Sequence, residues 1–246
     1  MMIDPLHQFM ITPLIQLSLV GYDVSFTNSS LFMVLATLSS ILLMAVATRS
    51  PQLIPGRIQF IGESLHRFVG QMIKDNIGEE GMPYLPYVMS LFLFILMGNA
   101  LGMIPYGFTF TSHIIVTFAL AMIVFVSVTI LGFIKHGTHF LRLFCPEGTP
   151  FYIVPLLVPV EIMSYFTRPV SLSVRLFANM MAGHAMLKIF AGFVIILAGT
   201  SLFPVAALPF VVNLAVVGFE FLVAFLQAYV FTVLTCIYLN DAIHLH

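Results

Sequence analysis

The chain has 246 residues, of which 60% are hydrophobic and 8% are charged, and its formal net charge is −1. A soluble domain carries about 25% charged residues, so the composition excludes a soluble globular protein and predicts an integral membrane protein. The small net charge argues against nucleic-acid binding. Cys145 and Cys236 have no metal-ligand spacing, so we interpret both as packing residues and expect no metal or cofactor.

The first part of the chain combines an uncharged span with an amphipathic segment. Residues 1–30 form an outer N-terminal segment without lysine or arginine, and residues 31–48 are long enough to cross a membrane with a few flanking residues. In residues 53–78 the apolar positions recur with the spacing of one helix face: Ile58, Ile61, Leu65, Phe68 and Met72. We expect an amphipathic helix in the membrane interface. A packed helix outside the membrane is the alternative.

Four further apolar stretches follow, at residues 84–104, 112–134, 151–198 and 202–240. The last two are too long for upright spans. From Glu161 to Lys188 a helix rises about 40 Å, whereas the hydrocarbon layer is about 30 Å thick. We therefore predict an all-α membrane domain with about five crossings. Its C-terminal half is a long, steeply tilted helical hairpin, with a kink expected at Pro169.

The basic residues predict how the chain is oriented. Residues 1–30 and the loop 105–111 contain none, whereas residues 49–83 and 135–150 contain several: Arg49, Arg57, Arg67, Lys74, Lys135 and Arg142. Because basic residues favour the inner side of a membrane, the N-terminus is expected outside. Five crossings then place the C-terminus inside.

The first helix of the predicted hairpin carries a polar stripe. Glu161, Arg168 and Arg175 are spaced by seven, so each is rotated by only about 20° from the one before. Asn179 lies beside the stripe. Four small residues flank it: Ser171, Ala178, Ala182 and Ala185. Small residues let another helix approach closely, so we expect this face to contact a partner rather than lipid.

Two further polar sets complete the hairpin. His184 lies about 180° around the helix from Arg175, and Lys188 follows it by one turn. The second helix carries Asn213, Glu220 and Gln227, again spaced by seven.

An arginine stays charged at any ordinary pH, whereas a buried carboxylate or imidazole can relay protons. The pattern suits two proton paths separated by a fixed charge. The alternative is a set of salt bridges that hold the hairpin together. For Arg168 and Lys188 a further alternative is that each long side chain extends from a helix end to the membrane surface.

Three strings resemble subunit a of the rotary F-type ATP synthase, in its alphaproteobacterial and mitochondrial branch. They are "LFILMGNALGMIPYGFTFTSH", "RPVSLSVRLFANMMAGH" and "LQAYVFTVLTCIYLNDAIHLH", and the resemblance extends from about residue 27 to the end. It implies a non-catalytic, proton-translocating stator subunit that offers two offset half-channels to a rotating ring of c subunits. Proton flow across the membrane is thereby coupled to ATP synthesis.

The resemblance also implies roles for individual residues. Arg175 is the residue essential for proton translocation, and Glu161 lines the inner half-channel. The outer half-channel would contain Asn99, His184 and Glu220, and Asn179 and Gln227 would support the arginine and the ring. From the polar stripes alone, and not from the resemblance, we expect Arg168, Lys188 and Asn213 to support these residues from nearby. Some relatives carry an acid where this chain has Gly102, so no acid from that helix is counted in the path.

The implied partners are the c-subunit ring, the peripheral-stalk b subunits, the rest of the ATP synthase complex, the lipid bilayer and the proton. The expected location is a bacterial inner membrane, with the mitochondrial inner membrane as the alternative.

Two other functions stay open at this point, a proton-coupled secondary transporter and a structural subunit of a respiratory complex. A transporter predicts inverted repeats and broken helices, and the sequence shows neither. An intramembrane enzyme would need a motif such as HExxH, which is absent.

Overall fold

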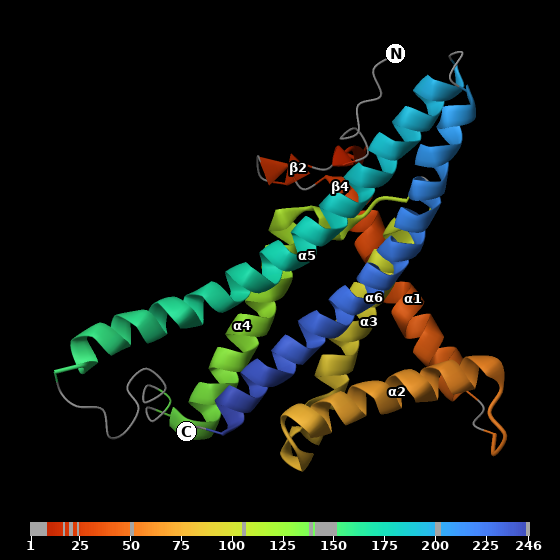
Figure 1. Ribbon diagram of the computed structural model, residues 1–246. Helices are drawn as coiled ribbons and strands as arrows, with labels where there is room; N and C mark the ends of the chain where they lie inside the picture. The colour runs from red at the N-terminus through yellow and green to blue at the C-terminus, as the bar shows by residue number, and fades with distance from the viewer. Residues whose placement is uncertain are drawn as a thin grey trace. The chain divides into compact units, whose positions relative to one another are not determined.

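The computed structural model describes residues 9–16, 18–19, 22–23, 25–49, 52–104, 107–137, 140, 152–199 and 203–244. Within these residues the protein is almost entirely helical, and five helices are long and apolar enough to cross a membrane (Figure 1). This confirms the predicted all-α membrane class. Arg142 and Cys145, which entered the predictions above, lie outside the described residues.

A small β arm precedes the first helix and was not predicted. Strand β1 (Pro13–Ile15) pairs with β4 (Phe26–Thr27), and β2 (Ser18–Leu19) pairs with β3 (Tyr22–Asp23), both antiparallel. The arm is fixed to the start of helix α1 (Asn28–Thr48) by Asn28. Its side chain donates to the Met10 carbonyl at 3.1 Å and accepts from the Thr12 N–H at 3.2 Å.

Helix α2 (Arg57–Asn76) carries the apolar stripe that the spacing predicts, and most of that stripe is exposed. Its buried residues are Gly62, Val69, Gly70, Met72 and Ile73, whereas Ile58, Ile61 and Phe68 are exposed. The helix therefore has two adjacent apolar strips, one packed within the protein and one left uncovered. Just beyond its last residue the N–H of Gly78 donates to the Lys74 carbonyl at 3.0 Å, and the positive φ of Gly78, 88°, then turns the chain away from the helix axis.

The next helices are joined by short 3₁₀ turns. The turn η2 (Glu79–Tyr84) leads into α3 (Leu85–Gly102), and the turn η3 (Phe110–Ser112) precedes α4 (Ile114–His136). The side chains of η3 are buried. That burial brings hydroxyl groups of the connection between α3 and α4 into the interior of the protein.

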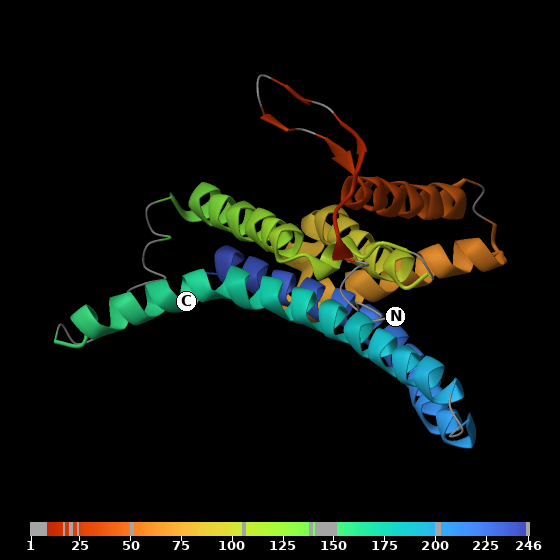
Figure 2. The same cartoon turned by 90° about the horizontal axis from the view of Figure 1, so that it is seen from above.

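The two C-terminal helices are much longer than the others. Helix α5 (Val154–Ala198) has 45 residues, and α6 (Ala207–Ile243) has 37 and follows the turn η5 (Phe203–Ala206). Helix α5 continues through Pro159 and Pro169 as one helix. Its C-terminal half and the N-terminal half of α6 lie side by side in both views (Figures 1 and 2).

Packing divides the chain into two compact units. The first takes its described residues from 1–44, 93–113 and 176–228 and has a core that includes Ala36, Ile95, Phe110, Leu176 and Met180. The second takes them from 45–92, 114–175 and 229–246, and its core includes Val69, Ile73, Phe92, Leu172 and Phe231. Cys236, also in the second unit, is fully buried, which fits a packing role.

Candidate functional site

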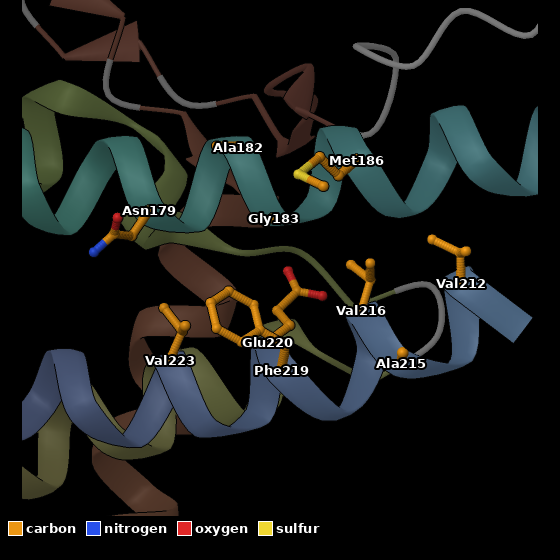
Figure 3. A pocket seen from close by; sticks show the side chains of 10 residues that line it. All are labelled: Asn179, Ala182, Gly183, Met186, Val212, Ala215, Val216, Phe219, Glu220 and Val223. Atoms are coloured by element: carbon orange, nitrogen blue, oxygen red, sulfur yellow. The ribbon is translucent and has the colours of Figure 1, made fainter. Parts of the chain in front are cut away.

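The centre of the first unit is a buried pair of titratable side chains from the two long helices. His184 of α5 is 8% exposed and Glu220 of α6 is 3% exposed. The Nδ1 atom of His184 lies 3.3 Å from Oε1 of Glu220. Figure 3 shows the carboxylate of Glu220 pointing from α6 toward Gly183 on α5. A Cβ atom at Gly183 would lie 2.8 Å from Oε1, so the absence of a side chain there lets the carboxylate approach α5.

The other nitrogen of His184 faces a hydroxyl from the connection between α3 and α4. Oγ1 of Thr109 lies 2.8 Å from Nε2 of His184, and the same hydroxyl donates to the carbonyl of Gly102 at 3.1 Å. The ring of Phe9 meets the imidazole edge-on, with centroids 6.4 Å apart. Nε2 of His184 is therefore held by a hydrogen bond, whereas Nδ1 only lies near Glu220, whose two buried carboxylate oxygens have no hydrogen-bond partner among the described residues.

A cavity of about 830 Å³, here the first cavity, opens onto this pair. One side of the first cavity comes from the N-terminal segment and α1, and another from the end of α3 and the following loop. The polar residues on its wall are Thr12, Asn28, His184, Lys188 and Glu220. This lining is suited to hold water, because buried water needs two or more polar partners.

A second cavity of about 460 Å³ lies between α5 and α6, and its lining extends to both sides of Gly183 along α5, from Asn179 to Met186 (Figure 3). Its walls are mostly apolar and include Ala182, Met186, Val216 and Phe219, with Asn179 at one end. Among the described residues Glu220 alone lines both cavities. Its carboxylate is thus the one group that can face both spaces.

Asn179 and Gln227 form a second polar contact between α5 and α6. The side-chain amide of Asn179 donates to Oε1 of Gln227 at 2.8 Å. Asn179 is exposed, whereas Gln227 is 3% exposed. Nε2 of Gln227 is buried and has no hydrogen-bond partner among the described residues. The side-chain oxygen Oδ1 of Asn213, two stripe positions earlier on α6, is likewise buried and has no hydrogen-bond partner among the described residues.

Arg175 and Glu161, both in the second unit, differ from these groups. Arg175 is exposed, and Glu161 is half-buried. Neither side chain forms a hydrogen bond or ion pair with any residue that the structure describes. Ser171 and Ala178, which flank Arg175 on α5, are exposed as well. A face of α5 that carries a permanent cation thus has no cover from the described part of the chain.

Arg168, also in the second unit, has a set of partners within the chain. Its guanidinium donates to Oδ2 of Asp241 at 2.7 Å. It also lies over the rings of Tyr165 and Tyr238, 5.5 and 5.1 Å from their centroids. The salt-bridge alternative therefore describes Arg168 well, and it does not describe Arg175.

Asn99 is fully buried, and its side chain serves the packing of the first unit. It donates to the backbone carbonyl of Ala224 at 3.2 Å and accepts from the hydroxyl of Thr111 at 2.9 Å. Asn99 is not among the described residues that line either cavity. Its contacts tie α3 to α6 near the buried pair, which is a supporting position.

Sequence reasoning missed Thr109 and Asp241. Thr109 lies in the connection after α3, where no helical period reveals which hydroxyl turns inward. Its only signal is the unusual density of hydroxyl residues in "FTFTSH". Asp241 lies near the C-terminus, and only the fold brings it to Arg168. Among the described residues, no cluster of three histidine, cysteine, aspartate or glutamate side chains could hold a metal ion.

Comparisons with known proteins agree on one family. The sequence model of the family described as "ATP synthase A chain" matches residues 30–240. A protein of Rhodospirillum rubrum named "ATP synthase subunit a" is 55% identical over 243 residues, which cover 99% of each chain. A protein of Parvibaculum lavamentivorans with the same name is 52% identical over 98% of this chain and 94% of its own. One of Paramagnetospirillum magneticum, also so named, is 51% identical over the whole of both chains.

Proposed function

We propose how protons pass through this chain, which belongs to the ATP synthase subunit a family. As a member of that family it is the proton-translocating stator subunit of the membrane sector, and it works in a complex with other ATP synthase subunits. It carries out no chemistry on ATP itself. The five membrane-length helices among the described residues fit this place in the enzyme.

The exposed surface of α5 and the bacterial relatives support a proposal for the specific partners and the location. A ring of c subunits faces Arg175, because this face of α5 holds a permanent charge that the described chain leaves unpaired. The b subunits of the peripheral stalk are further partners. Since the curated relatives named above are bacterial, the bacterial inner membrane is the location.

Protons enter through the first cavity and reach the pair of His184 and Glu220. Both side chains line that cavity, and 3.3 Å separates Nδ1 of one from Oε1 of the other. An imidazole beside a carboxylate can take up one proton and share it across such a short gap. Lys188 lies on the same wall of the first cavity.

Glu220 then passes the proton to the second cavity, whose wall it shares with Asn179. A carboxylate of the c ring collects the proton there and becomes neutral. A neutral carboxyl group can enter the lipid, whereas an ionised one cannot do so without a large cost. Gln227 supports this end of the cavity, since its Oε1 accepts a hydrogen bond from the Asn179 amide at 2.8 Å.

Arg175 separates this entry path from the exit path. Its fixed charge holds a passing ring carboxylate ionised, and because arginine does not release its proton, it cannot relay one. The deprotonated site forms beside Arg175, and the released proton leaves by way of Glu161 on the inner side. Protons therefore cross only by riding the ring, and this couples their flow to rotation.

One observation carries the proposal most directly. The two arginines of α5 differ in their ion pairing. Arg168 forms an ion pair with Asp241, whereas Arg175 is exposed and forms no ion pair with any described residue. A group from another subunit must compensate Arg175 within the membrane, and a carboxylate that comes and goes fits a rotor.

The test replaces each of the two arginines with lysine in the assembled enzyme and measures ATP-driven acidification of inverted membrane vesicles. Arg175→Lys is expected to abolish pumping, because an ammonium lacks the planar fork and can lose its proton when buried. Arg175→Ala should also abolish pumping and raise the passive proton leak. Arg168→Lys is the matched control, since a lysine still pairs with Asp241, and most pumping should remain. Near-normal coupled ATP synthesis in either Arg175 variant would contradict the assigned role.

A further inference from the structure

We propose that Thr109 is a positioning residue that fixes the protonation pattern of the His184 ring, with one proton held on Nε2 and with Nδ1 left to exchange a proton with Glu220. The inference rests on the proposed function, because it assigns a mechanism to the pair in the entry path. It starts from the hydroxyl of Thr109, which touches two groups at once.

The first of these groups is a carbonyl at a helix end. Helix α3 ends at Gly102, and the last carbonyls of a helix have no partner within the helix. The hydroxyl of Thr109 supplies one, with 3.1 Å between its Oγ1 and the Gly102 oxygen. A Cβ atom at position 102 would collide with the side chain of Thr109. Gly102 and Thr109 therefore fit together in this place as a pair.

The second group is Nε2 of His184, 2.8 Å from the same oxygen. A carbonyl oxygen only accepts hydrogen bonds, and a hydroxyl has a single proton to donate. Since Thr109 gives that proton to Gly102, its oxygen can only accept from the imidazole. Both contacts are hydrogen bonds together only if Nε2 carries a proton.

This pattern decides which nitrogen exchanges protons. With Nε2 protonated, the neutral ring presents a lone pair at Nδ1, and the charged ring presents an N–H there. Nδ1 faces Oε1 of Glu220 at 3.3 Å. In the transfer, the N–H bond at Nδ1 breaks and an O–H bond forms on Glu220, which leaves a neutral ring and a neutral carboxyl group. No ring flip or exchange between tautomers is needed in the cycle.

The other groups near the imidazole do not supply this orientation. Phe9 contacts the ring by its edge, and an aromatic edge offers no lone pair to an N–H. Lys188, one turn further along α5, is a hydrogen-bond donor and cannot accept from Nε2. Glu220 faces the opposite nitrogen. Thr109 is therefore the side chain of the described set that selects the tautomer.

The test compares Thr109→Val, which keeps the shape and loses the hydroxyl, with Thr109→Ser, which keeps the hydroxyl. Pumping by the assembled enzyme in vesicles is measured for both. The tautomer of His184 is read from nitrogen-15 spectra of the histidine-labelled complex, with the His184 signals assigned from a His184→Gln sample. We expect Thr109→Val to lose about fivefold in pumping rate and to populate the Nδ1–H tautomer. A fivefold population change corresponds to ~1 kcal/mol, the usual worth of one hydrogen bond.

Thr109→Ser should retain both the rate and the Nε2–H tautomer. Thr235→Val is the control for loss of a buried hydroxyl, since among the described residues Thr235 bonds only to the Phe231 carbonyl of its own helix, and it should pump normally. If Thr109→Val keeps the wild-type tautomer and rate, or if Thr109→Ser fails as Thr109→Val does, the positioning role is wrong. If instead His184→Gln and Glu220→Gln pump normally, the proposed entry path itself fails, whatever Thr109 does.

Discussion

Gly183→Ala tests the contact between α5 and the carboxylate of Glu220. An added Cβ at position 183 would lie 2.8 Å from Oε1 of Glu220 and 3.2 Å from its Cδ. Ordinary contact begins at 3.4 Å, so Oε1 must move by about 0.6 Å. The atom that must move is the end of a flexible side chain rather than backbone, so the carboxylate yields and the helix keeps its place.

The displacement affects function more than stability. Oε1 is already 3.3 Å from Nδ1 of His184, at the outer edge of the range over which a positioned group transfers a proton. A misplacement of about 1 Å can cost about 10²-fold in rate, so a shift of half that size is expected to lower pumping by about tenfold. The folding cost is small, because alanine favours a helix over glycine by ~1 kcal/mol and offsets part of the overpacking.

The assay is ATP-driven acidification of vesicles, normalised to the amount of assembled enzyme. Gly218→Ala is the matched control, since this glycine also lies in a long helix and a Cβ there meets nothing within 4 Å. Gly218→Ala should assemble and pump as the wild type does. If Gly183→Ala pumped equally well, Glu220 would not depend on the gap at Gly183, and the reasoning from this contact would be wrong. A loss of assembly in Gly183→Ala alone would refute the claim that the carboxylate yields.

Two other predictions follow from pairs of side chains. His184→Glu and Glu220→His should each lower pumping, because each variant places two acids or two imidazoles together. The double swap should recover a measurable part of the lost pumping. A double variant that pumps no better than the worse single variant would mean that the two residues act independently. Arg168→Ala and Asp241→Ala should each destabilise the extracted complex by about 1–3 kcal/mol in thermal unfolding, between the values for surface and buried pairs, and the double variant should lose less than the sum. Strict additivity would show that the 2.7 Å contact contributes nothing.

The helical fold followed from the sequence because membrane crossing requires long apolar stretches, and these are visible one by one. The β arm did not, because strands of two and three residues carry no hydrophobic period. Helix α2 shows a subtler limit. Its spacing predicted an apolar stripe for the membrane interface, and the structure packs only one member of that stripe, Met72, together with the adjacent Val69 and Ile73. Periodicity identifies apolar faces, and tertiary packing decides which of two adjacent faces is covered.

Some features of the candidate site were predictable from the sequence and others were not. The opposite orientations of Arg175 and His184 follow from their spacing on one helix, and the structure has the first exposed and the second buried. The contact between His184 and Glu220 depends on the pairing of two helices and on Gly183, which the sequence pattern did not single out. Thr109 depends on where helix α3 ends and how the next turn folds back. Such contacts have no signal in the linear pattern.

Arg168 and Arg175, seven residues apart on α5, each place a permanent positive charge in the membrane, but only Arg168 is neutralised by a described residue of its own chain. Each brings a permanent charge to a helix in the membrane, at a cost of roughly 2.5–3.5 kcal/mol on insertion scales. Asp241 and two aromatic faces compensate Arg168 within the chain. No described residue compensates Arg175. A permanent partner would stabilise the arginine and at the same time occupy it, so that it could no longer ionise a visiting carboxylate. An arginine that must interact with successive ring subunits has to remain unpaired within its own chain, and the exposed face of α5 leaves it so.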